Sequence, residues 1–122
     1  MATEYRATIV AIANQKGGVG KSTTAINLGA GLSLQGEKVL IVDLDPQGNT
    51  SSGLGVDRSR IDLSTYEVLI NETPIDDAIE ATSVRDLYVV PATIELAGAE
   101  IELVSVFSRE TRLAGALKPV LE

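Results

Sequence analysis

The stretch NQKGGVGKSTTAINL, residues 14–28, decides the fold of this 122-residue chain. Its three glycines before Lys21 lack Cβ atoms, so the backbone can turn sharply and come close to a ligand. Consecutive N–H groups then form a nest for an anion at the start of a helix, whose dipole also favours negative charge. Lys21 adds a positive charge, and the Ser22 hydroxyl suits Mg²⁺. The stretch therefore predicts a phosphate-binding loop.

The segments around this loop predict a strand–loop–helix–strand unit. Residues 7–13, ATIVAIA, are a short apolar run typical of a strand buried on both faces of a parallel sheet. Residues 21–35 predict a helix that Gly36 ends in a left-handed conformation. Residues 38–45, KVLIVDLD, predict a second buried strand. Such a connection is a right-handed βαβ unit, so the expected fold class is α/β, with a mostly parallel sheet flanked by helices.

The rest of the chain predicts shorter elements. Residues 46–60, PQGNTSSGLGVDRSR, are expected to form a long connecting loop. Ser64 and Glu67 form a capping box, and Pro74 suits the first position of another helix. The further elements are a third strand over 86–93 and helices over 64–70, from 73, and over 94–104 and 108–118, where Pro119 disfavours continuation.

Two acids stand at the end of the second predicted strand. Alternation places Asp43 and Asp45 on one side of the strand, with Leu44 opposite. The carboxyl ends of strands in open α/β sheets face the ligand crevice. Pro46 keeps Asp45 extended at the tip of the strand. Either carboxylate can hold a Mg²⁺-bound water or position an attacking water, and the alternative for both is a solvated strand end.

The loop departs from the usual G-x-x-x-x-G-K-[ST] pattern, because Gln15 occupies the first glycine position and a second lysine, Lys16, follows it. Lys21 serves a phosphate from inside the turn, whereas Lys16 lies on its outer side. Lys16 is either a surface charge or a cation that reaches a phosphate in a partner subunit. A cation supplied in trans is worth about 10³–10⁵ in phosphoryl-transfer rate and makes assembly depend on the nucleotide.

The composition excludes several classes of site. The chain has no cysteine and no histidine, which excludes disulfides and thiolate metal sites within it. Residues 1–60 carry six Lys/Arg against five Asp/Glu, and residues 61–122 carry four against twelve, which gives the net charge of -7. No basic stripe favours a self-sufficient nucleic-acid surface. No apolar run suggests a membrane span and the start does not read as a signal peptide, so a cytoplasmic protein is expected.

Three separated motifs resemble one family. KGGVGKST at residues 16–23 resembles the deviant Walker A motif of the ParA/MinD superfamily. VDLDPQGNTSSGLGV at 42–56 and VVPATIELAGAEIEL at 89–103 resemble its chromosome- and plasmid-partitioning branch, ParA/Soj. The resemblance implies a P-loop NTPase-like ATPase that uses ATP/ADP and Mg²⁺ and forms an ATP-sandwich homodimer.

The resemblance also implies roles for individual residues. Lys16 reaches across the dimer, Lys21 is the ordinary P-loop lysine, and Asp45 supports the attacking water. Gly17 lies at the close dimer contact, and Ser22 binds Mg²⁺, with Asp43 as the second metal candidate. The residues expected at the nucleotide are Lys16, Gly17, Gly18, Val19, Gly20, Lys21, Ser22 and Thr23.

The family domain is about twice as long as this chain, so residues 1–122 are expected to be the N-terminal part of a single domain. The remaining half would carry the Walker B carboxylate and the basic surface that binds DNA without sequence preference. The family further implies a ParB-type centromere-binding partner, a cytoplasmic location at the bacterial nucleoid and no membrane contact. Half a domain is expected to hydrolyse ATP poorly, if at all.

Four alternatives stay open or are disfavoured. A MinD-like division-site ATPase shares the loop but needs an amphipathic C-terminal helix. A nucleotide-binding module without turnover differs only in the natural length of the chain. An iron-protein reductase is disfavoured by the absence of cysteine, and a metabolite kinase by the missing first glycine. The sequence leaves open the chromosomal or plasmid origin, the stimulating partner and whether 122 residues are the natural product.

Overall fold

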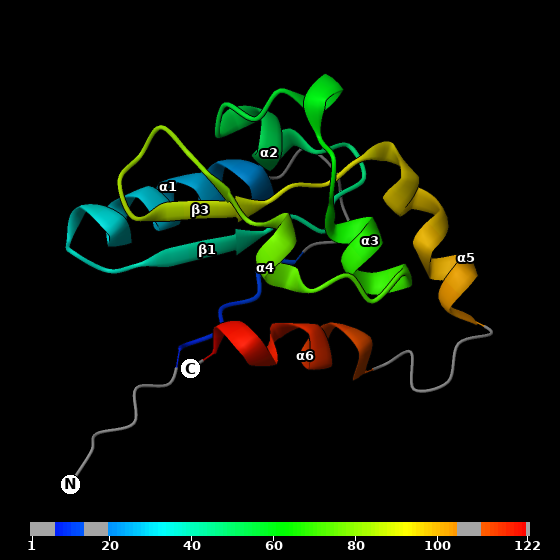
Figure 1. The fold of residues 1–122 in the computed structure, drawn as a ribbon. Helices are drawn as coiled ribbons and strands as arrows, with labels where there is room; N and C mark the ends of the chain where they lie inside the picture. Colours follow the sequence, from blue (N-terminus) through cyan, green and yellow to red (C-terminus); the bar gives the residue numbers. More distant parts are fainter. Residues whose placement is uncertain (1–6, 14–19, 105–110, 122) are drawn as a thin grey trace, which may run out of the picture.

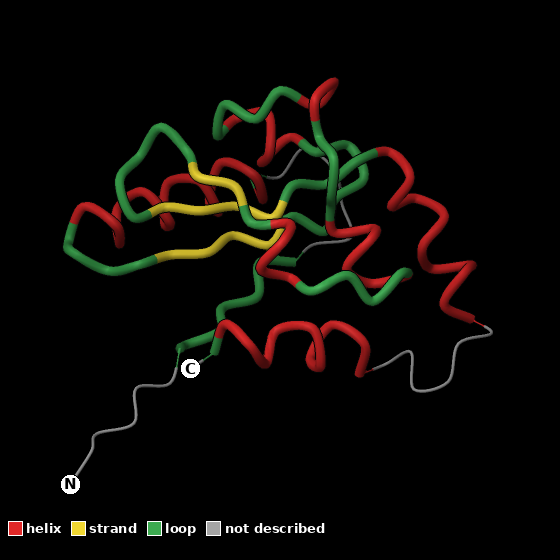
Figure 2. Tube along the Cα trace, viewed as in Figure 1, coloured by secondary structure: helices red, strands yellow, loops and turns green. Residues whose placement is uncertain are grey.

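The structure, a computed structural model, describes residues 7–13, 20–104 and 111–121. A small sheet lies between two layers of helices, as Figures 1 and 2 show. One face carries α1 and α2, and the other carries α3, α4 and α6. The helix bounds are Lys21–Leu34 for α1, Asn49–Gly53 for α2, Thr65–Ile70 for α3, Ile75–Ala78 for α4, Ala99–Val104 for α5 and Arg112–Leu117 for α6.

The sheet has three strands in the order β1-β3-β2. β1 (Val39–Val42) runs parallel to β3 (Leu87–Val90), in the register that pairs Val39 with Leu87. β2 (Glu80–Ala81) runs antiparallel to β3. The predicted α/β class is confirmed, but the parallel neighbour of β1 is β3 rather than the strand predicted over 7–13. The sequence did not predict β2, which makes the sheet mixed.

Alternate residues of the strands face opposite helical layers, as the pleat of a strand requires. On the α1 side, Leu87 and Val89 pack with Leu54. On the other side, Val90 packs with Val68 of α3 and Ile75 of α4. Because helices cover both faces of the sheet, β3 is mostly buried, whereas all four residues of β1 are only half-buried, less than its apolar sequence indicated.

The end of α1 follows the prediction closely. The helix stops at Leu34, one residue before the predicted Gln35, and Gly36 adopts the left-handed conformation with φ +95°. The Gly36 N–H donates to the Ser33 carbonyl, and the Glu37 N–H donates to the Leu32 carbonyl. These two bonds form a Schellman motif, which turns the chain back towards β1.

The central glycine of α1 sets how closely the helix approaches the sheet. A Cβ at Gly29 would lie 2.9 Å from Ile41 Cδ1 and 3.1 Å from Leu87 Cδ1, whereas one at Gly31 would meet nothing within 4 Å. We expect Gly29→Leu to destabilise the fold by about 1–3 kcal/mol through overpacking. Gly31→Ala, the matched control, should stabilise it by about 0.5–1 kcal/mol through helix propensity. Urea unfolding of both variants measures this, and equal stabilities would contradict it.

The predicted first strand is wrong. Residues 7–13 form no strand, and Ile9 and Val10 are 62% and 61% exposed. The Ala7 N–H donates to the Leu121 carbonyl, beyond α6, rather than to a strand. An apolar run identifies a segment that can be buried, but a strand also needs a neighbour on its edge. In the described part of the chain, β1 and β2 both pair with β3, and neither pairs with this segment.

Two other predicted segments are subdivided. The expected loop over 46–60 contains α2 and the 3₁₀ turn η1 (Arg58–Arg60), because the left-handed Gly48, with φ +66°, starts a helix directly after the acids. The helix predicted over 94–104 is the 3₁₀ turn η2 (Ile94–Gly98) followed by α5. Residues 108–110 of the last predicted helix lie outside the described residues, and α6 passes into η4 (Lys118–Val120).

The predicted N-cap of α3, Ser64, is confirmed, but its hydroxyl bonds to the Tyr66 N–H and the Glu67 carboxylate rather than in the reciprocal pattern of a capping box. Ser64 Oγ accepts the Tyr66 N–H at 3.2 Å and donates to Glu67 Oε2 at 2.7 Å, and α3 ends at Ile70 as predicted. The next helix, α4, begins after Pro74, which is its N-cap rather than its first residue. None of the helices in the described ranges is long and apolar enough to cross a membrane.

A phenol–carboxylate bond joins α3 to α5. Tyr66 Oη donates to Glu102 Oε2 at 2.7 Å, and this bond raises the pKa of Tyr66 above its usual value of 10.0. In the unfolded chain the phenol ionises near 10, while in the folded protein it stays protonated to higher pH. We therefore expect the stabilisation to be present below pH 10 and lost as the pH rises through the folded pKa.

Absorbance at 295 nm measures this ionisation. One tyrosine should titrate above its usual range in the native protein, and Tyr66→Phe should remove that transition. Glu102→Gln, the matched control, keeps the phenol and removes the carboxylate, so Tyr66 should then titrate nearer its usual value. An unchanged titration curve in both variants would contradict the assignment.

Candidate functional site

The N-terminus of α1 lies beside the carboxyl end of β1. The helix runs antiparallel to β1, so its first turn stands beside the carboxyl end of that strand (Figure 1). Gly20, the N-cap, is left-handed with φ +87° and has no side chain to cap the helix. The first intrahelical bond runs from the Thr24 N–H to the Gly20 carbonyl at 2.9 Å. The first turn thus presents the electropositive end of a helix of 14 residues.

The side chains at this end suit a phosphate and its metal. The first turn of α1 contains no acid that would compensate the helix dipole. Lys21 and Ser22 are half-buried in it, and Thr23 is exposed. Among the residues that the structure describes, none has an atom within 4 Å of a Cβ placed on Gly20. An ammonium, a hydroxyl and an uncompensated helix end therefore fit the triphosphate and Mg²⁺ that the sequence predicts.

Four of the predicted site residues, Lys16, Gly17, Gly18 and Val19, lie outside the described residues. Their roles at the nucleotide and at the dimer contact stay predictions. The roles of Gly20, Lys21, Ser22 and Thr23 also stay predictions, although the structure places all four at the start of α1.

Asp43 is held by the loop that follows it. Its side chain is buried at 4% exposure. Oδ1 accepts the Asp45 N–H at 3.0 Å, and Oδ2 accepts both the Ser51 N–H at 3.0 Å and the Ser51 hydroxyl at 2.6 Å. An ionised carboxylate has about four acceptor positions, so these donors use three of them. Asp43 therefore organises the loop, and its predicted role towards Mg²⁺ stays a prediction.

Two hydroxyls connect the end of β1 to the end of β3. Ser51 Oγ accepts the Ala92 N–H at 3.0 Å while it donates to Asp43. Thr65 Oγ1 lies 2.7 Å from the Asp43 carbonyl and 3.1 Å from the Pro91 carbonyl. Ser51 and Thr65 are fully buried. The two loops at the carboxyl edge of the sheet are therefore fixed to each other by side chains.

Asp45 stands at the rim of this network. Its side chain is half-buried, and Oδ1 accepts the Gln47 N–H at 3.0 Å. No residue of the described ranges donates to Oδ2. One oxygen of Asp45 thus shapes its own turn, and the other is available to a water. This geometry fits the predicted role in positioning the attacking water.

Sequence reasoning missed Ser51 and Thr65, and it missed Arg58, whose guanidinium donates to the Pro46 and Gln47 carbonyls in the loop after β1. Ser51 and Thr65 bond to groups from eight to 41 residues away. Nothing in a local pattern identifies a serine whose partners are that distant. The glycine-rich composition of residues 46–60 did indicate a functional loop, but not which of its side chains hold it.

The sequence pattern of the AAA domain family matches residues 7–122. The chain is 55% identical over 112 residues to the sporulation initiation inhibitor protein Soj of Bacillus subtilis, covering 92% of this chain and 44% of that protein. It is 53% identical over 112 residues to the chromosome partitioning protein ParA of Myxococcus xanthus, covering 92% and 40%. The chain thus spans less than half the length of these curated relatives.

Three solved structures share the fold. Cobyrinic acid a,c-diamide synthase of Mycobacterium smegmatis, with an ATP analogue and magnesium, superposes with a TM-score of 0.84 at 44% identity, over 88% of this chain and 44% of that one. An ATP complex of Cyanothece McdA superposes with a TM-score of 0.82 at 32% sequence identity, over 90% of this chain and 42% of that one. MinD of Pyrococcus horikoshii with Mg-ADP superposes with a TM-score of 0.68 at 31% sequence identity, over 86% of this chain and 40% of that one. ATP, ADP and magnesium are therefore ligands of homologous structures.

The relatives and solved structures agree with the predicted family and with the α/β fold. The chain belongs to the AAA domain family, with the P-loop NTPase fold of the ParA- and MinD-type ATPases and strong homology to the Soj and ParA partitioning proteins.

Proposed function

We propose that this chain is the nucleotide-binding part of a ParA/Soj-type partition ATPase. One observation carries the proposal. Lys21 and Ser22 begin α1 beside the carboxyl end of β1 (Figure 1), and Asp45 follows that strand in the sequence, in a chain that is 55% identical to Soj over 112 residues. A phosphate site and a water-positioning carboxylate at one edge are what ATP hydrolysis requires.

In this proposal each side chain has a separate task. The loop amides and Lys21 bind the β- and γ-phosphates, and Ser22 and Asp43 are the residues that would hold Mg²⁺. Magnesium, when bound, neutralises charge on the phosphate oxygens. Asp45 orients a water for attack on the γ-phosphorus, the bond to the ADP oxygen breaks, and inorganic phosphate leaves. Most of the rate then comes from positioning and from electrostatic stabilisation.

The assembly in the proposal is an ATP-dependent homodimer. Lys16 of one protomer reaches the phosphates held by its partner, and Gly17 permits close approach of the two loops. Residues 1–122 form part of a single domain, and the rest of that domain supplies the surface for non-specific DNA. A ParB-type protein stimulates turnover, and dimers at the nucleoid in the cytoplasm drive segregation of a chromosome or plasmid.

Nucleotide-dependent assembly of the full-length protein tests this function. Multi-angle light scattering should give a dimer mass with Mg-ATP and a monomer mass with Mg-ADP or with ATP and EDTA. Steady hydrolysis should rise when duplex DNA and the cognate centromere-binding protein are added together. A monomer under all conditions, with no hydrolysis, would refute the proposal.

A second candidate is an ATP-dependent amide synthetase, because the Mycobacterium smegmatis structure described as a diamide synthase is 44% identical. That activity predicts hydrolysis that depends on cobyrinic acid and a nitrogen donor rather than on DNA. A MinD-like ATPase instead predicts stimulation by phospholipid vesicles. The same hydrolysis assay with these additions in turn distinguishes the three.

A further inference from the structure

The turn that carries Asp45 is closed from inside by Asp45 itself. The Gly48 N–H donates to the Asp45 carbonyl at 2.8 Å, and the Gln47 N–H donates to Asp45 Oδ1 at 3.0 Å. These bonds fold residues 45–48 into a tight turn but leave its two inner carbonyls, those of Pro46 and Gln47, without a partner inside the turn. The orientation of Asp45 therefore depends on what receives those carbonyls.

Arg58 receives both of them. Its guanidinium donates from Nη2 to the Pro46 carbonyl at 3.0 Å and from Nη1 to the Gln47 carbonyl. The planar guanidinium presents two parallel donors, which two adjacent carbonyls can accept together. In the described part of the chain, no carboxylate lies within ion-pair distance of Arg58. This half-buried arginine is thus dedicated to the turn rather than to a salt bridge.

The turn has a glycine where the guanidinium approaches. Gly48 is buried and left-handed, with φ +66°. A Cβ at this position would lie 2.6 Å from Arg58 Cζ and 2.8 Å from Nε. Any side chain at Gly48 would therefore displace the guanidinium from the two carbonyls. The close contact makes Gly48 and Arg58 two parts of one clamp.

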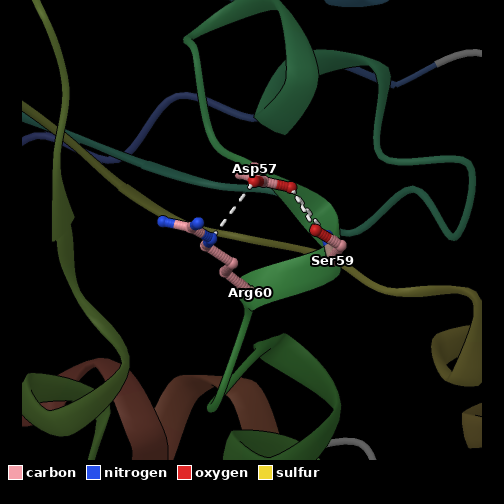
Figure 3. Close-up of polar contacts among 3 residues, drawn as sticks. All are labelled: Asp57, Ser59 and Arg60. Atoms are coloured by element: carbon pink, nitrogen blue, oxygen red, sulfur yellow. Dashed lines mark hydrogen bonds and ion pairs between the residues drawn. The ribbon is translucent and has the colours of Figure 1, made fainter.

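Arg58 is the first residue of the 3₁₀ turn η1, which positions its side chain next to Gly48. Asp57 Oδ1 accepts the Ser59 N–H at 3.0 Å and the Ser59 hydroxyl at 2.6 Å, and Oδ2 lies 3.6 Å from Arg60 Nε (Figure 3). The Ser59 hydroxyl, followed by its amide, lowers the pKa of Asp57. The side chain of Arg60 is 86% exposed, so the same turn supplies a matched arginine outside the clamp.

We infer that Arg58 is a positioning residue that holds Asp45 in the orientation needed to direct the attacking water. The inference rests on the proposed ATPase function and deepens it by adding a residue that does not touch the nucleotide. Arg58 fixes the backbone of the turn, and the turn fixes the carboxylate. Its loss is therefore expected to slow the chemical step while leaving nucleotide binding at the start of α1 intact.

Steady-state kinetics of the full-length protein test this with Arg58→Ala, Arg58→Lys and Arg60→Ala. Arg58→Ala should lower kcat about 10–100-fold, because a displacement of about 1 Å can cost that much, with the KM for ATP changed less than about twofold. Arg58→Lys should restore only part of the loss, since one ammonium does not reproduce two parallel donors. Arg60→Ala should behave as the parent protein.

Gly48→Ala provides an independent variant that keeps the arginine but displaces it. It should show the same selective loss of kcat, and the double variant with Arg58→Ala should be no slower than the slower single variant. Binding of a fluorescent ATP analogue and the midpoint of urea unfolding are measured for each variant. They separate a slow chemical step from a damaged fold.

Three results would overturn the inference while leaving the proposed function standing. The first is a parent protein that hydrolyses ATP and an Arg58→Ala variant whose kcat stays within twofold. The second is a parallel loss of kcat, ATP binding and stability in Arg58→Ala, Arg58→Lys and Gly48→Ala, which indicates a structural role only. The third is an equal loss in Arg60→Ala. A parent protein that neither binds nor hydrolyses ATP would refute the proposed function as well.

Discussion

Replacing Lys21 with alanine is expected to lower ATP turnover of the full-length protein by a factor on the order of 10²–10³, because one preorganised cation is removed from the developing phosphate charge. Affinity for ATP should fall as well, since this lysine contacts the phosphates before reaction in the proposed mechanism. Binding of a fluorescent ATP analogue and phosphate release measure the two effects. Lys21→Arg keeps the charge but changes its geometry, so it should recover binding better than turnover.

Lys16→Ala is the matched comparison, and it should separate binding from assembly. Each protomer keeps its own Lys21, so affinity for ATP should change little. The dimer mass with Mg-ATP should disappear, and stimulated turnover should fall by about 10³–10⁵, the worth of a cation supplied in trans. If Lys16→Ala dimerises and responds to its partner like the parent, Lys16 is only a surface charge. If Lys21→Ala binds ATP like the parent, the phosphate site is wrongly assigned.

Asp43→Ala is expected to have the largest effect on stability. It removes the acceptor of three hydrogen bonds and leaves the Ser51 N–H, the Ser51 hydroxyl and the Asp45 N–H to find new partners at a buried position. Each unsatisfied buried donor costs about 1–3 kcal/mol, so the free energy of unfolding should fall by about 3–5 kcal/mol. Asp43→Asn keeps one acceptor oxygen but turns an amide donor towards these groups, so it should cost about 1–3 kcal/mol.

Asp45→Asn is the control for Asp43→Ala. The Asp45 variant should lose turnover with little change in stability, whereas the Asp43 variant should lose stability. Asp45 is half-buried and makes one local side-chain bond, so its replacement should change the unfolding free energy by less than about 1 kcal/mol. The same replacement should abolish most of the turnover. Chemical denaturation and phosphate release of both variants measure the contrast. An Asp43→Ala variant within about 1 kcal/mol of the parent would contradict the network described here.

The elements with local signals could be predicted from the sequence. Helix α1 has a glycine at each end, and its bounds agree within one residue. The capping residue Ser64 predicted the start of α3, and the apolar runs predicted β1 and β3. In each case the stabilising groups lie within a few residues of one another, so the local sequence is enough to predict the element.

The elements that depend on distant partners could not be predicted. Residues 7–13 have the composition of a strand, but no strand of the described chain pairs with them. The two-residue β2 exists only because Glu80 and Ala81 meet Val89 and Tyr88 in space. The short helix α2 contains Ser51, whose N–H donates to the carboxylate of Asp43, eight residues earlier in the chain. Periodicity shows what a segment can bury, but not which segment it meets.

The candidate site was predicted in outline. Reasoning from the strand ends placed Asp43 and Asp45 at the ligand crevice; both follow β1, whose carboxyl end lies beside the start of α1 (Figure 1), and their roles stay predictions. Alternation gives the two acids the same side of the strand, and only Pro46 and the family resemblance distinguished them, with Asp45 expected at the attacking water and Asp43 as a metal candidate. The structure separates them through burial: Asp43 is enclosed by donors from its own loop, and Asp45 keeps one oxygen towards the rim.

The hydroxyl of Ser51 has a mechanical consequence for this edge of the protein. It donates to Asp43 and accepts from Ala92, so one atom belongs to the loops that follow both β1 and β3. A shift of the first loop by more than about 0.5 Å would break the bond from the Ala92 N–H to Ser51 Oγ unless the second loop moved with it. The two loops are therefore expected to move together. A displacement of the turn at Asp45 would then also shift Ala92 and the segment after it, η2 and α5.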